Sequence, residues 1–552
     1  MKTYTNPAYA YRRPGDLDGT GRRWPVVVAG AGPVGLTAAI DLGQRGVDVL
    51  LVDEDDTVSA GSRAICWSKR TLEIFDRLGC AEPMVEKGVG WNVGRVYFGD
   101  QEVYAFDLLA EDGHRRPAFI NLQQYWVEQF LVERLSGLPR AEIRWRSKVV
   151  GVELGADHVV VRIRTPDGEY AVRADWLIAA DGAKSPIRNM LGLECEGQVF
   201  HDRFLIADIH MRSAFPAERR FWFDPPFHRN QSALLHRQAD DVWRVDFQLG
   251  WDADPEAEKR PQRIVPRLRA MLGEDAQFDI EWASVYTFQC RRMRSFRLGR
   301  AIFAGDAAHL VSPFGARGAN SGIQDADNLV WKLALVQAGL APESLLDSYD
   351  AERSFAADEN IRHSTRSTDF ITPKSPASRT FRDAVLGLAR RHAFARQLVN
   401  SGRLSQPTVL SVSPLNTPDR AADGFDGAVV PGAAAVDAPV HGSRGDWLLG
   451  CLSGGFVVLS FGEAPPKEAC CALAREAVPC AVLQIGGAGG GDVIDDVRGL
   501  AAKRYDAKPG SCYLLRPDQH VCARWRSFDA AAIRAAIARA IGATERAAKA
   551  AA

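Results

Sequence analysis

The chain has 552 residues, of which 46% are hydrophobic and 25% are charged. This length allows about three or four domains with sizeable cores, and the composition is that of an ordinary globular protein. The 68 basic residues nearly balance the 69 acidic ones, so no basic surface and no nucleic-acid partner are expected.

We predict a polar arm over residues 1–24, which lacks the apolar segment of a secretory signal. A strand, a glycine loop, a helix and a second strand follow in WPVVVAGAGPVGLTAAIDLGQRGVDVLLVDED. Here Gly30 permits a tight turn, Gly32 lets the backbone approach a pyrophosphate, and Gly35 lets the helix pack closely on the strand. Asp53 ends the second strand, where its carboxylate can accept hydrogen bonds from ribose hydroxyls. The unit predicts dinucleotide binding.

The next stretch predicts strands over residues 93–109, a helix over 123–135 and further strands over 142–180. The last strand runs directly into Asp181-Gly182-Ala-Lys-Ser185-Pro-Ile-Arg188. An aspartate at the end of a strand can bind a ribose hydroxyl. Asp181 is therefore a second candidate for contact with a nucleotide.

Residues 197–290 are rich in aromatic and alternating segments and predict a mainly antiparallel sheet. The aromatic residues 221–223, with Trp243 and Phe247, either line an aromatic pocket or pack within the sheet. Aromatic residues at a period of two favour sheet packing.

Residues 300–333 predict a strand, a glycine-rich loop and a helix. The loop contains Gly305, Asp306, His309, Pro313, Gly315, Gly318 and Asn320. Such a loop can place N–H groups around a polar part of a cofactor. The alternative is a plain strand–turn–helix unit in which the aspartate is an N-cap.

The remainder predicts helices over 345–403, a linker over 405–436 and alternating strands and helices to about residue 541. The glycine-rich stretch 486–491 precedes an acidic helix start and predicts a flexible loop rather than a phosphate site. No apolar run reaches the roughly 18 residues of a membrane span. The ten cysteines contain no C-x-x-C pair, so we expect no metal site and reduced thiols in a cytoplasmic protein.

Together the three loop motifs resemble those of the flavin-dependent aromatic hydroxylases with the p-hydroxybenzoate hydroxylase fold. The elements G-x-G-x-x-G, D-G-x-x-S-x-x-R and G-D-A-A-H…P…G…G-x-N occur in the family's order and at its spacing. The resemblance covers nearly the whole chain. It is closest to the long hydroxylases, such as phenol hydroxylase and 3-(3-hydroxyphenyl)propionate hydroxylase.

The resemblance implies FAD as the cofactor. In the family the first glycine loop holds the diphosphate, the D-G element contacts both FAD and NAD(P)H, and the G-D aspartate holds the ribitol. Gln124 matches a flavin-contacting glutamine, with Gln123 as the alternative register. Carried over to this chain, the cofactor-binding residues are Gly30, Gly32, Gly35, Asp53, Arg63, Gln124, Asp181, Asp306, Pro313, Gly318 and Asn320.

The implied fold class is α/β, with a Rossmann-type FAD-binding domain interleaved with a mainly antiparallel substrate sheet and followed by a thioredoxin-like domain. We assign residues 25–196 and 291–404 to the FAD-binding domain, with an excursion into the substrate domain near 85–115. The substrate domain takes 197–290 and the thioredoxin-like domain 437–545. Because YLLRPDQHVCARW resembles the last strands of that domain without any C-x-x-C, we expect a structural role, with a homodimer contact left open.

Tyr286 is the candidate catalytic residue. The segment Ser284–Phe288 resembles the phenol hydroxylase segment whose tyrosine hydrogen-bonds the substrate hydroxyl. One departure matters, because Ile65 stands where phenol hydroxylase has an aspartate as candidate base. The residue that assists phenol deprotonation must lie elsewhere, and His236 and His228 are candidates on composition alone.

The implied reaction is hydroxylation of a phenolic aromatic substrate with O2 and NAD(P)H through a flavin C4a-hydroperoxide. With a single complete dinucleotide fold, a disulfide reductase is disfavoured and NAD(P)H is expected to bind transiently. One alternative is a flavin monooxygenase that acts on a polycyclic or non-phenolic substrate. Another is a flavoprotein whose C-terminal domain makes it chiefly a binding module.

Overall fold

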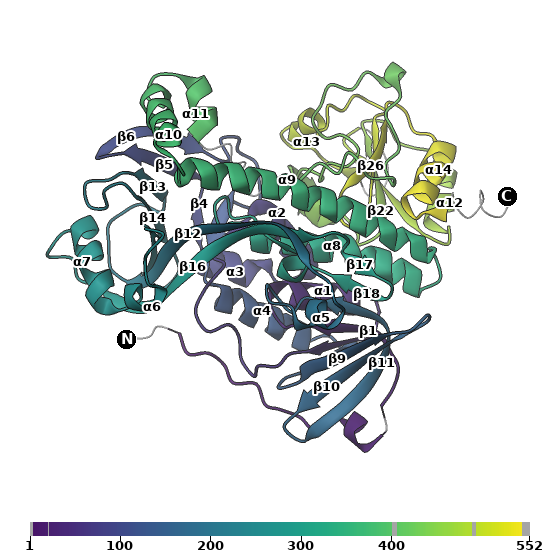
Figure 1. Ribbon diagram of the computed structural model, residues 1–552. Helices are drawn as coiled ribbons and strands as arrows, with labels where there is room; N and C mark the ends of the chain where they lie inside the picture. The colour runs from purple at the N-terminus through teal and green to yellow at the C-terminus, as the bar shows by residue number, and fades with distance from the viewer. Residues whose placement is uncertain (1–3, 20, 400–403, 405, 488–492, 544–552) are drawn as a thin grey trace.

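The computed structural model describes residues 4–19, 21–399, 404, 406–487 and 493–543. Two eight-stranded sheets and a separate five-stranded sheet organise these residues (Figure 1). The mixed α/β architecture, with an antiparallel second sheet and an extra C-terminal domain, confirms the predicted fold class. Residues 488–491 of the glycine-rich stretch lie outside the described residues.

The first sheet has the order β17-β18-β11-β1-β2-β8, and β10 and β9 extend it from β11. Strand β1 pairs in parallel with both β2 and β11. Its residues Val26–Ala29 are buried because a central parallel strand is covered on both faces. The strands are β1 (Trp24–Ala29), β2 (Val49–Val52), β8 (Ala141–Arg144), β9 (Lys148–Leu154), β10 (Val159–Thr165), β11 (Gly168–Ala179), β17 (Arg297–Leu298) and β18 (Ala301–Phe303).

Helix α1 follows β1 directly and packs against α4 and α8. Between β2 and α4 the chain also forms a small three-stranded sheet in the order β3-β7-β4. The helices are α1 (Pro33–Gln44), α2 (Lys69–Leu78), α3 (Ala81–Lys87), α4 (Gln124–Ser136), α5 (Pro186–Met190) and α8 (Gly318–Gln337), and the short strands are β3 (Cys66–Ser68), β4 (Val89–Trp91) and β7 (Phe119–Asn121).

The second sheet has the order β19-β16-β12-β15-β14-β13-β5-β6. Its pairs are antiparallel apart from β13 and β5, which run in parallel. The strands are β5 (Val93–Phe98), β6 (Gln101–Asp107), β12 (Cys195–His210), β13 (Arg219–Phe223), β14 (Ser232–Arg237), β15 (Val242–Leu249), β16 (Asp279–Met293) and β19 (His309–Leu310).

The two faces of this sheet have different partners because side chains alternate along each strand. On one face, Leu205 and Phe247 pack with Leu268 of α7 (Pro261–Leu272), which follows the short helix α6 (Pro255–Glu258). On the other face, Phe204 and Leu234 pack with residues of the loop before α8 and of the helices that follow it. We call this second surface the inner face.

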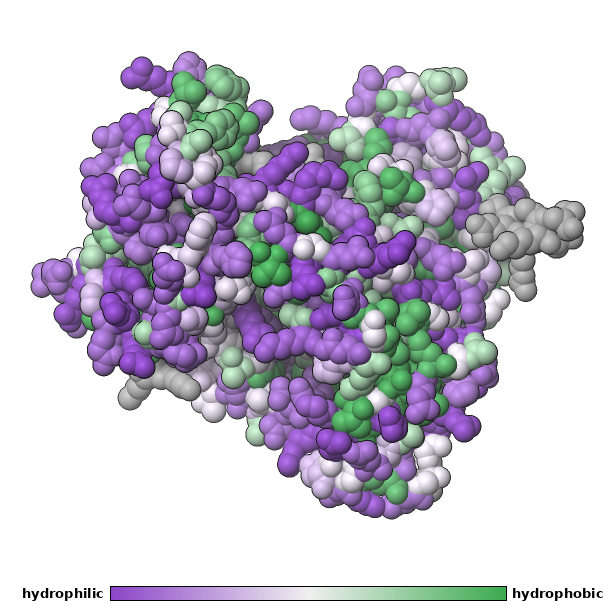
Figure 2. All heavy atoms as spheres, in the orientation of Figure 1, coloured by the Kyte–Doolittle hydropathy of each residue, from purple (hydrophilic) through white to green (hydrophobic). Residues whose placement is uncertain are grey.

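Helix α9 (Asp347–Ile371) runs from the C-terminal domain to the second sheet, where α10 (Pro376–Ala389) and α11 (Ala393–Val399) follow it (Figure 1). Figure 2 shows a mostly hydrophilic surface on which hydrophobic side chains gather over α10 and α11. Phe381 on α10 and Phe394 on α11 are 58% and 62% exposed. Among the described residues, no helix is both long and apolar enough to cross a membrane.

The C-terminal domain is a mixed sheet in the order β24-β23-β22-β25-β26. Parallel β22 and β23 flank helix α12, and the antiparallel pair β25–β26 leads into α14. The elements are β20 (Pro439–Gly442), β21 (Gly445–Trp447), β22 (Phe456–Phe461), α12 (Lys467–Ala474), β23 (Cys480–Ile485), β24 (Val493–Ile494), α13 (Leu500–Arg504), β25 (Cys512–Leu515), β26 (Val521–Trp525) and α14 (Ala530–Ala540). Five 3-10 turns complete the described elements, η1 (Gly15–Asp18), η2 (Gly305–Ala307), η3 (Glu343–Leu346), η4 (Ala421–Asp423) and η5 (Leu449–Cys451).

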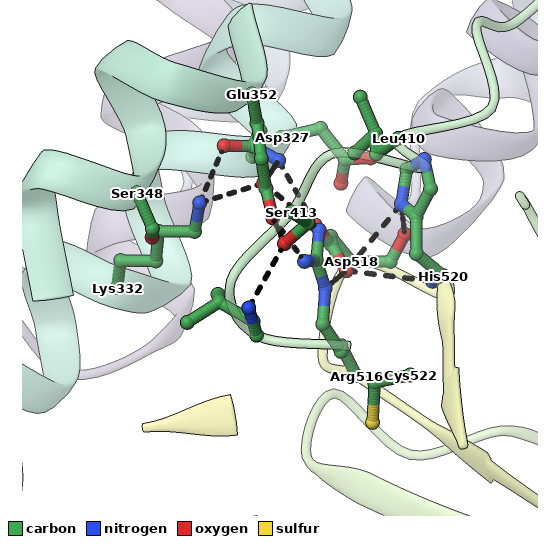
Figure 3. Close-up of polar contacts among 12 residues, drawn as sticks. Asp327, Lys332, Ser348, Glu352, Leu410, Ser413, Arg516, Asp518, His520 and Cys522 are labelled. Atoms are coloured by element: carbon green, nitrogen blue, oxygen red, sulfur yellow. Dashed lines mark hydrogen bonds and ion pairs between the residues drawn. The ribbon is translucent and has the colours of Figure 1, made fainter. Parts of the chain in front are cut away.

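A buried charged network joins this domain to α8 and α9 (Figure 3). Arg516 donates to Glu352 Oε1 at 2.6 Å and to Asp518 Oδ2 at 2.6 Å. Lys332 on α8 donates to Glu352 Oε2 at 2.8 Å. These four side chains are fully buried. Paired in this way, they fix how the C-terminal domain sits on the two helices.

Candidate functional site

The glycine loop after β1 has the geometry that its sequence predicts. Gly30 has φ 104°, and a Cβ there would lie 2.4 Å from the carbonyl oxygen of Ala180. A Cβ at Gly35 would lie 1.9 Å from the carbonyl oxygen of Gly30, so helix and loop touch through backbone. A Cβ at Gly32 would meet nothing within 4 Å. Helix α1 begins there without a capping side chain, which leaves N–H groups for a phosphate.

Asp53 follows β2 and lies beside this loop. Its Oδ2 accepts a hydrogen bond from the Ala31 N–H at 2.5 Å, and its Oδ1 accepts one from the Asp55 N–H at 2.9 Å. Burial raises the pKa of Asp53, while these two hydrogen bonds lower it. The carboxylate thus forms part of the loop structure, at the place where the sequence predicts a ribose contact.

Asp181 follows β11, the parallel neighbour of β1. Its carboxylate accepts from Ser185 Oγ at 2.6 Å and from the Ile187 N–H at 3.0 Å, so it holds the first turn of α5. Arg188 on this helix donates to the carbonyl oxygen of Ala307 at 2.8 Å. Arg188 therefore connects the D-G-x-x-S-x-x-R motif to the G-D-A-A-H motif. The spacing of the motifs in the sequence could not reveal this contact.

Asp306 lies in η2, directly after β18. Its side chain is exposed, and no described residue donates a hydrogen bond to its carboxylate. The protein around it nevertheless raises its pKa through desolvation, with His309 as the largest opposing charge. Below it, Asp325 of α8 accepts from the Gly305 N–H at 2.9 Å and pairs with His309 Nε2 at 2.7 Å. The backbone next to Asp306 is thus anchored to α8, while its carboxylate is open to a ligand.

The first turn of α8 contains a residue whose side-chain amide is fully engaged. Asn320 Oδ1 accepts from the Ser68 N–H and from Thr71 Oγ1, while its Nδ2 donates to the carbonyl oxygens of Cys66 and Ala316. Any contact between Asn320 and a ligand is left to its backbone. Pro313 is exposed, and Gly318 is the first residue of α8.

Two of the predicted residues, Arg63 and Gln124, lie on separate segments that meet at Ala64. Arg63 has an exposed side chain, and its carbonyl oxygen accepts from Arg244 Nη1 at 3.2 Å. Gln124 opens α4 and accepts from the Ala64 N–H at 3.1 Å. Gln123 is 1% exposed and donates to the carbonyl oxygen of Ala239 at 3.0 Å. Of these two glutamines, Gln124 is therefore the more accessible to a ligand.

Tyr286 lies on β16 opposite Phe204 of β12, so it belongs to the inner face. No described residue hydrogen-bonds its hydroxyl, and burial raises its pKa, opposed by the charge of Arg244. Arg244 of β15 donates to Asp208 Oδ1 at 2.8 Å and to the carbonyl oxygen of Ser62. This arginine therefore anchors the inner face to the segment around Arg63.

The structure separates the predicted aromatic cluster. Phe221 and Phe223 pack with the inner face, whereas Trp222, Trp243 and Phe247 pack on the α7 side. His228 also lies on the α7 side, where its ring packs against Phe247 with a centroid distance of 5.2 Å. The first group can contact a ligand held at the inner face, and the second group stabilises the sheet.

His236 lies on β14 and is 4% exposed. It stands opposite Arg244, so it belongs to the inner face. Asp246, two residues beyond Arg244 on β15, shares this face and was not among the sequence candidates. A single aspartate within an alternating strand has no sequence signature that distinguishes it.

Comparisons with known proteins identify these features. A family model described as an FAD binding domain matches residues 23–364, more than half of the chain. The 3-(3-hydroxy-phenyl)propionate/3-hydroxycinnamic acid hydroxylase of Mycolicibacterium smegmatis is 30% identical over 365 residues, 65% of this chain and 64% of that enzyme. The 6-methylpretetramide 4-monooxygenase of Streptomyces rimosus is 33% identical over 387 residues, 66% of this chain and 67% of that enzyme. The chain thus spans slightly less than two thirds of the mycobacterial relative.

Solved structures extend the likeness to the C-terminal domain. The flavin-dependent monooxygenase PieE, in complex with FAD and substrate, superposes with a TM-score of 0.80 at 24% identity. That match covers 94% of this chain and 99% of PieE. The p-nitrophenol 4-monooxygenase PnpA of Pseudomonas putida matches at 28% identity with a TM-score of 0.60, over 70% of this chain and 100% of PnpA.

Proposed function

The chain belongs to the FAD-binding monooxygenases of the p-hydroxybenzoate hydroxylase fold, and on this premise we propose that it hydroxylates a phenolic aromatic compound with O2 and NAD(P)H. FAD is its cofactor. The observation that carries the proposal is the unpaired hydroxyl of Tyr286, which lies on the sheet face that Arg244 anchors to the segment around Arg63. When bound, FAD would take a hydride from NAD(P)H, react with O2 and supply the oxygen atom.

The described residues fit this cofactor. The open space at Gly32 and the uncapped start of α1 suit the diphosphate, and the unpaired carboxylate of Asp306 suits a ribitol hydroxyl. Asp53 would hold the adenosine ribose and Asp181 would contact FAD and NAD(P)H, each through oxygens that also order its own loop. Arg63, Gln124, Pro313, Gly318 and the backbone of Asn320 complete the set that we assign to FAD.

Tyr286 would act on the substrate rather than on FAD. A phenol has a pKa of about 10, like tyrosine, so at neutral pH it is mostly protonated and reacts slowly with an electrophilic oxygen. A hydrogen bond from the Tyr286 hydroxyl stabilises the phenolate form and lowers that pKa. The surrounding aromatic side chains exclude water and orient the ring.

A second candidate substrate class is polycyclic. The monooxygenase of Streptomyces rimosus acts on 6-methylpretetramide, and an aklavinone-11 hydroxylase has the same fold with a TM-score of 0.77. A panel of simple phenols, phenylpropionates and polycyclic quinones, supplied to the FAD-loaded protein, separates the two classes. We expect a phenol to stimulate NAD(P)H oxidation with formation of a dihydroxylated product. Turnover of the polycyclic compounds alone would replace the phenolic assignment with the second one.

A further inference from the structure

Three neighbouring strands of the second sheet bring polar side chains together on the inner face. Asp246 of β15 stands opposite Leu234 of β14, and Leu234 stands opposite Phe221 of β13. Because directly opposed residues point to the same side of a sheet, Asp246 shares its face with His236, two residues beyond Leu234, and with Arg219, two residues before Phe221. The three side chains come from segments that are distant in the sequence.

The polar groups of this cluster are unsatisfied. His236 is 4% exposed, its Nδ1 has no hydrogen-bond partner, and its Nε2 lies 3.9 Å from Asp246 Oδ2, beyond hydrogen-bonding distance. No described residue forms a hydrogen bond with the Asp246 carboxylate or with the Arg219 guanidinium. Leaving a buried polar atom such as His236 Nδ1 without a partner is unfavourable. A polar ligand that bonds to these groups would remove this cost.

The cluster lies where a substrate of the proposed reaction would bind. Arg219 lines a cavity together with Phe221, Phe223 and Phe314, and Phe314 belongs to the loop that precedes α8. Asp246 is also near Tyr286, because its negative charge is one of the causes that raise the pKa of the Tyr286 hydroxyl. A ring held between the Tyr286 hydroxyl and this loop would therefore have Asp246 as a neighbour.

We propose that Asp246 accepts the proton of the substrate's phenolic hydroxyl. This assignment rests on the proposed function and supplies the base that Ile65 cannot provide. The O–H bond of the phenol breaks, an O–H bond to Asp246 forms, and the negative charge moves from the carboxylate to the phenolate. The proton returns to the product oxygen when the neutral product leaves. No electron donor or acceptor is involved in this step.

The electrostatics of the cluster suit a base. Burial raises the pKa of Asp246 to about 6, the cations Arg244 and Arg219 oppose this shift, and Asp208 adds to it. The other titratable groups that face Asp246 are His236, Tyr286 and Cys66. At neutral pH the carboxylate is therefore deprotonated, yet it is a stronger base than an exposed aspartate.

The test is the pH dependence of kcat/KM for hydroxylation by the FAD-loaded protein. For the wild type we expect kcat/KM to fall as the pH drops through about 6, because protonation removes the base. Asp246→Asn keeps the shape and should lower kcat/KM at neutral pH by roughly 100-fold or more. The pH profile of the variant should lack the fall in kcat/KM near pH 6. Its kcat/KM should rise only as the pH approaches the pKa of the phenol itself. Asp279→Asn, an exposed aspartate on β16, is the matched control and should match the wild type.

A second substrate separates proton transfer from folding. A nitro-substituted phenol is largely ionised at about pH 8, so it needs no base, and Asp246→Asn should hydroxylate it within about threefold of the wild type. Equal losses for both phenols, or no loss for either, would overturn the role of Asp246 while leaving the hydroxylase intact. A wild type that hydroxylates no phenol would overturn the proposed function, and this assignment with it.

Discussion

Single residues show which structural features sequence motifs predict and which they do not. Gly30 and Gly35 were predictable because a side chain at either position would collide with backbone. The fully engaged amide of Asn320 was not predictable, since three of its four partners lie about 250 residues away. The place of Asp246 on the inner face was not predictable either, because it depends on the strand register. Motifs therefore predict backbone constraints well and side-chain partners poorly.

Replacing Tyr286 by Phe removes only the hydroxyl that we assign to the substrate oxygen. FAD content should stay normal while oxygen transfer slows, because the phenolate loses a stabilising hydrogen bond. Unused oxidant should then appear as hydrogen peroxide, so NAD(P)H consumption would exceed product. Tyr97→Phe is the matched control, since Tyr97 stacks on Trp222, away from the inner face. An unchanged ratio of product to NAD(P)H would make Tyr286 a purely structural residue.

Replacing Asp306 by Ala removes a carboxylate that no described residue hydrogen-bonds. We expect weaker FAD binding by about 1.5–3 kcal/mol, the range for a hydrogen bond to a charged group. The dissociation constant of FAD, measured by flavin fluorescence, tests this, with exposed Glu274→Ala as the control. FAD affinity equal to that of the wild type would refute the assignment of Asp306 to the ribitol.

At the scale of elements, α8 connects the site to the C-terminal domain. It begins at Gly318 beside the predicted flavin loop, carries Asp325 beneath Asp306, and places Lys332 against Glu352. The sequence predicted this helix and its loop from a local motif. It could not predict the bounds of β12 and β16, because both are single long strands whose pairing depends on the tertiary fold.

Glu352→Gln should destabilise the folded protein by about 3–5 kcal/mol, because Lys332 would remain buried without its counter-charge and Arg516 would keep only Asp518. Burial alone would raise the pKa of Glu352, but Arg516 and Lys332 hold it well below its usual value of 4.5. Its stabilisation is therefore present above about pH 4.5 and is lost as the pH falls toward the lowered folded-state pKa.

Urea unfolding of wild type and Glu352→Gln at pH 7 and at lower pH measures this difference, which should narrow under acid conditions. Glu343→Gln, which removes a partly exposed partner of Arg300, serves as control and should cost less than about 1 kcal/mol. Equal stability of Glu352→Gln and wild type at pH 7 would show that the network does not hold the C-terminal domain in place.

At the scale of the whole molecule, the fold class and the cofactor were implied by the family resemblance that three loop motifs carry. Such motifs are informative because a dinucleotide constrains backbone geometry strongly. The docking of the C-terminal domain did not follow, because Arg516 and Glu352 are 164 residues apart. The resemblance implied an extra domain, and the structure explains its attachment through buried charge pairs. Substrate choice depends on side chains from several strands, which no single motif records.

The most direct test of the central claim is the origin of the oxygen atom in the product. The FAD-loaded protein should be supplied with NAD(P)H, a phenol from the substrate panel and 18O2, and the mass of the product should be measured by mass spectrometry. We expect one labelled oxygen atom per molecule of product, with no label incorporated from H2 18O under unlabelled O2. A product labelled from water, or NAD(P)H oxidation that yields only hydrogen peroxide with every compound tested, would contradict it.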